Sequence, residues 1–115
     1  KAEKIGSSYV IIGQLDTGVV EQGRGAIDML RKKAGSTAIV LGLSGDDGKA
    51  MLLAAMTDDL VKKGLKAGDI VREIAPIVGG GGGGRPQMAQ AGGKNASKIP
   101  EALAKAEEMI KEKLG

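Results

Sequence analysis

A run of glycines constrains this chain of 115 residues more than any other feature. Eight of the fifteen residues at positions 79–93 are glycine, and positions 79–84 are six glycines in a row. Glycine has no Cβ, so such a run is either a flexible linker or a segment whose backbone lies very close to something else. Linkers usually combine Gly with Ser or Thr, whereas this run continues as Arg85-Pro86-Gln87-Met88. That pattern tilts the interpretation slightly towards a site.

The rest of the chain predicts one α/β domain spanning residues 1–115. Apolar runs predict strands at residues 9–12, 37–43 and 49–56, with a tight turn at 44–48, and a short strand at 88–91. Apolar residues at helical spacing predict helices at about 22–34, 70–78 and 100–114, with a short turn at 57–64. We therefore expect a mixed β-sheet with a central hairpin, covered by about three helices, and a glycine-rich loop before the last helix.

The composition excludes several kinds of chemistry. The sequence contains no His and no Cys, so zinc knuckles, thiolate nucleophiles and a Ser-His-Asp triad are ruled out. Its one aromatic residue is Tyr9, which argues against platforms on which bases stack. No apolar run approaches the roughly 18 residues that a membrane span needs. We expect no signal peptide, because the apolar stretch at residues 9–12 is too short and no small-residue cleavage site follows it. Since the chain begins with Lys1 and not with Met, we expect it to be part of a longer protein.

Nucleotide-binding motifs are not supported. Six consecutive glycines match G-x-G-x-x-G trivially, and that motif belongs after a strand, whereas this run follows a predicted helix. The segment from Gly18 to Gly25 has the spacing of a P-loop but lacks its Lys and its hydroxyl residue. We therefore expect no ATP binding by this chain.

An anion site remains as an interpretation of the glycine run. Consecutive glycine amides can turn towards phosphate oxygens without obstruction by side chains. Residues 74–100 contain no Asp or Glu, yet they include Arg85, Lys94 and Lys98. The net charge of +3 permits a polyanion as partner. On composition alone, a plain flexible loop with solvated lysines is an equally good interpretation.

Residues 64–93 resemble a known family. A helix ending near Ala75-Pro76 leads into the glycines and then into Gly84-Arg85-Pro86-Gln87-Met88-Ala89-Gln90-Ala91-Gly92-Gly93. This motif resembles the C-terminal domain of alanyl-tRNA synthetase, called C-Ala, in the DHH-associated domain superfamily. The likeness extends to the upstream hairpin and the final helix. The helical segment that usually precedes the globular part of C-Ala is at most a remnant at residues 1–6.

The resemblance implies a non-catalytic module that binds the outer corner of tRNA and helps to couple aminoacylation with editing. It implies a cytoplasmic parent enzyme that joins alanine to its tRNA with ATP and magnesium, has zinc in its editing domain, and forms homodimers in some bacteria. The partners would be alanine-accepting tRNA and the catalytic and editing domains, with no membrane. For this chain it implies no cofactor and no metal. The predicted tRNA-binding residues are Gly79, Gly80, Gly81, Gly82, Gly83, Gly84, Arg85, Gln87, Lys94, Lys98 and Arg24.

Two alternatives stay open. The substrate-binding domains of DHH phosphoesterases, which act on nucleotides or single strands, carry Gly-Gly-Gly-His followed by Ala-Ala-Gly. This chain has Arg85-Pro86 where that His would stand, so the synthetase branch is preferred. The other alternative is a purely structural or dimerising module, which would bind no nucleic acid.

Overall fold

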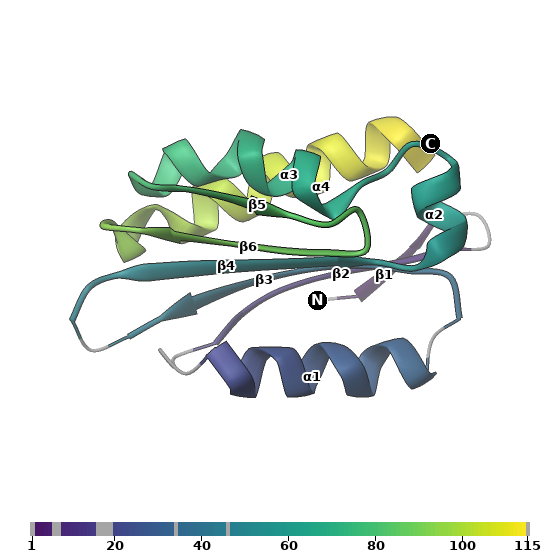
Figure 1. Ribbon diagram of the computed structural model, residues 1–115, viewed down its shortest axis with the longest axis horizontal. Coiled ribbons are helices and arrows are strands. Elements are labelled where there is room, and N and C mark those ends of the chain that lie inside the picture. The colour runs from purple at the N-terminus through teal and green to yellow at the C-terminus, as the bar shows by residue number, and fades with distance from the viewer. Residues whose placement is uncertain (1, 6–7, 16–19, 34, 46, 115) are drawn as a thin grey trace.

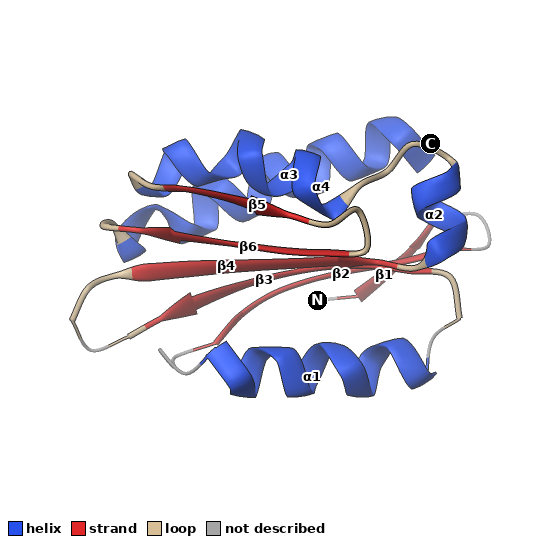
Figure 2. Cartoon of the chain, viewed as in Figure 1, coloured by secondary structure: helices blue, strands red, loops and turns tan. Residues whose placement is uncertain are grey.

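A single β-sheet forms the middle layer of the molecule, with helices on both of its faces (Figure 1). The computed structural model describes residues 2–5, 8–15, 20–33, 35–45 and 47–114. Its strands are β1 (Ala2–Ile5), β2 (Ser8–Leu15), β3 (Thr37–Ser44), β4 (Ala50–Met56), β5 (Gly81–Gly84) and β6 (Met88–Gly93) (Figure 2). Its helices are α1 (Val20–Lys33), α2 (Asp58–Lys62), α3 (Ala67–Ile74) and α4 (Ile99–Leu114), with 3-10 turns η1 (Ala75–Val78) and η2 (Ala96–Lys98).

The sheet is mixed, as the sequence predicts. Its strand order is β1-β2-β3-β4-β6-β5. β2 and β3 run parallel because α1 connects them as a crossover, whereas the other neighbouring pairs run antiparallel. β3 and β4 form the central hairpin. Helix α1 covers one face, and α3 and α4 cover the other (Figure 1). The predicted fold class is therefore confirmed.

The N-terminal segment differs from the expectation of a helical remnant at residues 1–6. Ala2–Ile5 forms β1, which pairs with β2 in the register Ala2 with Ile11 and Ile5 with Ser8. The predicted strand at 9–12 is also longer, since β2 extends over the whole of Ser8–Leu15. Polar and glycine positions that break the apolar run still take part in the ladder, because strand pairing needs only backbone groups.

The hydrophobic core has two parts, one on each face of the sheet. In β3, Ile39, Leu41 and Leu43 face α1, while Ala38 and Val40 face α3 and α4. Alternation along a strand sends successive side chains to opposite faces. Because helices cover both faces, this strand is apolar at nearly every position.

The glycine segment is not the loop that the sequence predicts, because four of its residues form the edge strand β5. An added Cβ at Gly82 would lie only 2.4 Å from the backbone oxygen of Gln90, and one at Gly84 only 2.8 Å from the Cα of Ala89. On the α3 side, an added Cβ at Gly68 would lie 2.8 Å from the backbone oxygen of Gly84. The backbone of β5 thus comes very close to both β6 and α3, which only residues without side chains permit.

The predicted helix at 70–78 divides into two elements. Helix α3 ends at Ile74 and continues as the 3-10 turn η1, where Pro76 has no N–H to donate to a helical hydrogen bond. Gly79, with a φ of 72°, then ends η1 in a left-handed conformation. None of the helices in the described ranges is both long and apolar enough to cross a membrane.

A small polar network stabilises the start of α2. The hydroxyl groups of Ser36 and Thr57 donate hydrogen bonds to the carboxylate of Asp59. These two bonds, the one from Ser36 first, lower the pKa of Asp59 below its ordinary value. The ionised carboxylate therefore stabilises the fold, because it is better accommodated in the folded chain than in the unfolded one.

We expect Asp59→Asn to lower stability at neutral pH and to matter less in acid. A carboxyl with a depressed folded pKa contributes stability above its unfolded value, near pH 4, and loses it as the pH falls through the folded pKa. Urea unfolding at pH 7 and at pH 3 measures this effect. The difference in the free energy of unfolding between wild type and variant should be smaller at pH 3. Asp58→Asn, at an exposed neighbour, is the control. A gap of equal size at both pH values would contradict the prediction.

Candidate nucleic-acid interface

The turn between β5 and β6 borders a surface hollow that contains several of the predicted site residues. The turn consists of Arg85, Pro86 and Gln87, all of them exposed. Backbone bonds fix it on two sides, since Ala67 N–H donates to Pro86 O at 2.8 Å and Met56 N–H to Gln87 O at 2.9 Å. The hollow has a volume of about 430 Å³ and is lined by Arg24, Gly83, Gly84, Arg85, Met88, Ala89 and Gln90.

Arg24 reaches this hollow from α1. Its Nη2 donates a hydrogen bond of 2.6 Å to Oε1 of Gln90. The preceding residue, Gly23, lets the helix lie close to the sheet, because an added Cβ there would lie 2.6 Å from Cδ1 of Leu53. Arg24 and Arg85, which are 61 positions apart in the sequence, therefore line the same hollow.

Gln90 was not among the predicted site residues, although it lies within the family motif. It pairs with Leu53 of β4, whose side chain faces α1, and this register places Gln90 on the same face. The alternation of polar Gln90 between buried Ala89 and Ala91 is the sequence signal that marks it.

Hydrogen bonds within the chain limit how many glycine amides can take part in the predicted anion site. Gly79 N–H donates to Pro76 O at 3.0 Å, and Gly80 N–H to Ala75 O at 3.1 Å. Both amides are therefore already bonded within the chain.

The register of the hairpin decides the direction of the other four amides. Arg85 N–H donates to Met88 O at 2.9 Å, and hydrogen-bonded pairs alternate along an antiparallel ladder. The amides of Gly81 and Gly83 therefore point at β6, and those of Gly82 and Gly84 point away from it. The six glycine amides therefore do not all point towards one anion site in this structure.

Lys94 and Lys98 lie at the other end of β6. This strand has six residues, so it separates them from the turn by roughly 17 Å. There, Ala96 N–H donates to Gly48 O at 2.9 Å, and Nζ of Lys98 lies 3.8 Å from Oε1 of Glu101. Lys98, within the segment that contains no Asp or Glu, thus lies close to the carboxylate of Glu101. The structure divides the predicted site into two ends and brings only one of them together with Arg24.

Arg72 is a further basic residue beside the glycine strand that sequence reasoning did not select. It lies on α3, and its Cγ is 4.0 Å from the position that a Cβ would occupy at Gly83. It forms an ion pair with Asp69, one helical turn earlier. In the sequence it is one of many charged residues on the exposed side of a helix, so only the packing of α3 against β5 distinguishes it.

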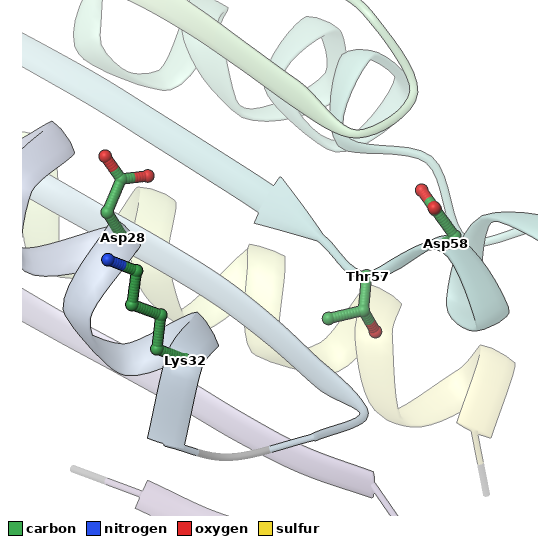
Figure 3. Close-up of a pocket in the computed structure, with 4 residues that line it drawn as sticks. All are labelled: Asp28, Lys32, Thr57 and Asp58. Atoms are coloured by element: carbon green, nitrogen blue, oxygen red, sulfur yellow. The ribbon is translucent and has the colours of Figure 1, made fainter.

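A second hollow on the surface has a different character. Asp28 and Lys32 of α1 line it from one side, and Thr57 and Asp58 from the other (Figure 3). Two carboxylates and one ammonium group do not favour a polyanion. Within the described ranges, no group of three or more acidic, His or Cys residues is arranged to hold a metal ion.

Comparison with known proteins gives consistent results. The profile of the DHHA1 domain matches residues 8–112. The alanine-tRNA ligase of Pelotomaculum thermopropionicum is 50% identical over 105 residues, which is 91% of this chain and 12% of that enzyme. The alanine-tRNA ligase of Rhodopirellula baltica is 49% identical over 97% of this chain and 12% of its own length. The chain thus spans about one eighth of these relatives.

Solved structures extend the comparison to the whole fold. A member of the s1p family of ribosomal proteins, in its DHH domain, has a TM-score of 0.62 at 17% identity, covering 96% of this chain and 27% of that one, and so shares the fold. The crystal structure of the C-Ala domain from the alanyl-tRNA synthetase of Aquifex aeolicus has a TM-score of 0.80 at 30% identity, covering 99% of this chain and 97% of that one. Together, the matching domain profile and the shared fold show that this chain belongs to the DHHA1 domain family, in the branch of the C-Ala domains.

Proposed function

We propose that this chain binds tRNA as the C-terminal domain of an alanine-tRNA ligase. One observation carries the proposal: Arg24 and Arg85 converge on the hollow at the β5–β6 turn, beside a strand with no side chains. Guanidinium groups and backbone amides are suited to phosphate and ribose oxygens. The names of the relatives support tRNA as the source of those groups.

The proposed contact uses the backbone of the RNA. Tyr9, the one aromatic residue of the sequence, lies on β2, and β3 and β4 separate that strand from β6. Its ring is also near Nζ of Lys4, which lies 5.7 Å from the ring centroid. Bases therefore have no aromatic partner at the turn. Phosphate and sugar contacts of this kind respond to the shape of the RNA and hardly to its base sequence.

The predicted contacts take unequal parts in this proposal. Arg85, Arg24 and Gln87 form the principal contact, with the outward amides of Gly82 and Gly84. Lys94 and Lys98 would form a separate and weaker contact at the other end of β6, because Glu101 partly compensates the charge of Lys98. In this arrangement, the bonded amides of the glycine run support the strand and do not bind RNA.

The longer protein would supply the chemistry. We propose that a catalytic domain of the same protein attaches alanine to its tRNA with ATP and magnesium, and that an editing domain with zinc removes mischarged serine or glycine. The present chain would take no cofactor. It would bind alanine-accepting tRNA in the cytoplasm, as part of a longer enzyme that forms a homodimer.

We expect Arg85→Ala to weaken tRNA binding about tenfold, since a charge-assisted hydrogen bond is worth about 1.4 kcal/mol or more. The negative slope of log K against log salt should become shallower by roughly 0.7 to 0.9 for one lost phosphate contact. Fluorescence anisotropy with labelled tRNA over a salt titration measures both quantities. Lys105→Ala, on the exposed side of α4, is the matched control for the loss of one charge. Equal affinity and slope for Arg85→Ala and wild type would refute the assignment of Arg85.

Competition separates the proposed function from the phosphoesterase alternative. Excess folded tRNA should displace the labelled tRNA at lower concentration than an excess of short single strands. The opposite order would favour a domain that binds single-stranded substrates. If neither competitor nor labelled tRNA binds at micromolar concentration, the domain is a structural or dimerising module.

A further inference from the structure

Three arginines from three separate elements surround the glycine strand. Arg24 lies on α1, Arg85 lies in the β5–β6 turn, and Arg72 lies on α3. Helices α1 and α3 are on opposite faces of the sheet (Figure 1). The positive charge therefore flanks the hairpin on both faces.

We propose that Arg72 is a further contact for the RNA backbone, and that Asp69 holds it beside β5 and competes with phosphate for it. This inference rests on the proposed function. Nothing in the sequence motif assigns a part to either residue.

The position of Arg72 supports the first half of the proposal. Its Cγ lies 4.0 Å from the Cβ position of Gly83, so its stem lies beside the strand. The outward amides of Gly82 and Gly84 are on the residues that flank Gly83. A phosphate that bound those amides would therefore lie beside the stem of Arg72. Because arginine binds carboxylate and phosphate through the same planar arrangement of donors, the group facing Asp69 is equally suited to phosphate.

The exposure of the ion pair supports the second half. The side chain of Arg72 is 64% exposed and that of Asp69 is 51% exposed. Exposed pairs of this kind contribute little to stability, since water and salt screen both charges. If a phosphate replaced Asp69 as the partner of Arg72, the stability of the fold would therefore change little. The carboxylate also repels an approaching phosphate, so it should lower the affinity for RNA while it orients the arginine.

The closing experiment is a salt titration of tRNA binding with four variants. We expect Arg72→Gln to bind tRNA roughly three- to tenfold more weakly. Its negative slope of log K against log salt should be shallower by about 0.7 to 0.9. Asp69→Asn should bind about threefold more tightly. In the double variant Arg72→Gln/Asp69→Asn, the change at Asp69 removes only the repulsion between its carboxylate and phosphate. The gain in affinity from Asp69→Asn should therefore be smaller in the Arg72→Gln background than in the wild type. Arg85→Ala is the fourth variant and reports on the proposed site itself.

The chain offers a matched control. Lys105 and Glu108 on α4 form an exposed pair with the same spacing, with Nζ and Oε1 3.8 Å apart. Lys105→Gln and Glu108→Gln make the same changes of charge on another helix, and neither should alter the affinity by more than about twofold. Melting curves of all variants check that the fold is retained, because substitutions at exposed positions rarely cost more than about 0.5 kcal/mol.

The outcomes are distinct. If Arg85→Ala weakens binding while Arg72→Gln changes neither affinity nor slope, the inference on Arg72 is overturned and the proposed function stands. If Asp69→Asn fails to tighten binding, the competition is overturned. If Lys105→Gln weakens binding as much as Arg72→Gln does, only net charge matters and the assignment of Arg72 is wrong. If wild type binds no tRNA, both proposals fail.

Discussion

Gly82→Ala is expected to lower the free energy of unfolding by about 2 kcal/mol, which is typical of an overpacked site. The melting temperature should fall by roughly 8 °C for a domain of this size. The physical reason is that the added methyl would lie 2.4 Å from the backbone oxygen of Gln90 and 2.5 Å from the Cα of Ala91. These atoms belong to the neighbouring strand, which is also held by β4, so they have little freedom to move away.

Gly81→Ala is the matched control. An added Cβ at Gly81 meets nothing within 4 Å, and the φ of this residue is not in the left-handed range. We expect its melting temperature to stay close to that of wild type, within about 0.5 kcal/mol in stability. Thermal unfolding followed by circular dichroism compares the two variants. Equal melting temperatures would show that β5 does not lie as close to β6 as described.

Leu53→Ala is expected to cost about 3 kcal/mol, as truncations of fully buried leucines do. Leu53 lies in the middle of β4, it is 0% exposed, and its Cδ1 fills the space left open by Gly23 of α1. The cavity left by the truncation would lie directly beneath α1. Since α1 positions Arg24, tRNA binding should also weaken under conditions in which the variant remains folded.

Met29→Ala, on α1 itself, provides the comparison. Its side chain is 60% exposed, so its removal should change stability by less than about 0.5 kcal/mol. Urea unfolding of both variants measures the difference. A loss at Met29 as large as that at Leu53 would mean that α1 is packed in a different orientation.

The apolar patterns explain why much of the fold is predictable from the sequence. Continuous apolar runs in β3 and β4 signal strands that are covered on both faces, and the turn residues between them signal a hairpin. The glycines of β5 have no side chains and so carry no alternation, which is why a strand there cannot be distinguished from a loop. Its close packing against α3 requires the glycine at position 68, and the significance of Gly68 appears only when the two elements are packed together.

Which residues gather at the β5–β6 turn is only partly predictable from the sequence, for a physical reason. Arg85 and Gln87 could be found because they adjoin the glycines in sequence. Lys94 and Lys98 adjoin them too, but a strand advances by about 3.3 Å per residue and carries them to the far end of the sheet. Arg72 lies beside the glycine strand through the packing of α3 against β5, which no local pattern in the sequence shows. Arg24, which the sequence analysis does name, lines the hollow from a helix 61 positions away from Arg85.

The hydrogen bond between Arg24 and Gln90, which joins residues 66 positions apart, has a thermodynamic consequence. A surface assembled from such distant segments exists only while the whole domain is folded, so a peptide that contains the glycine motif alone should have no comparable affinity. Binding and unfolding are then linked. A ligand present at a hundred times its dissociation constant would add about 2.7 kcal/mol to the apparent stability of the domain, and the thermal shift would report its affinity.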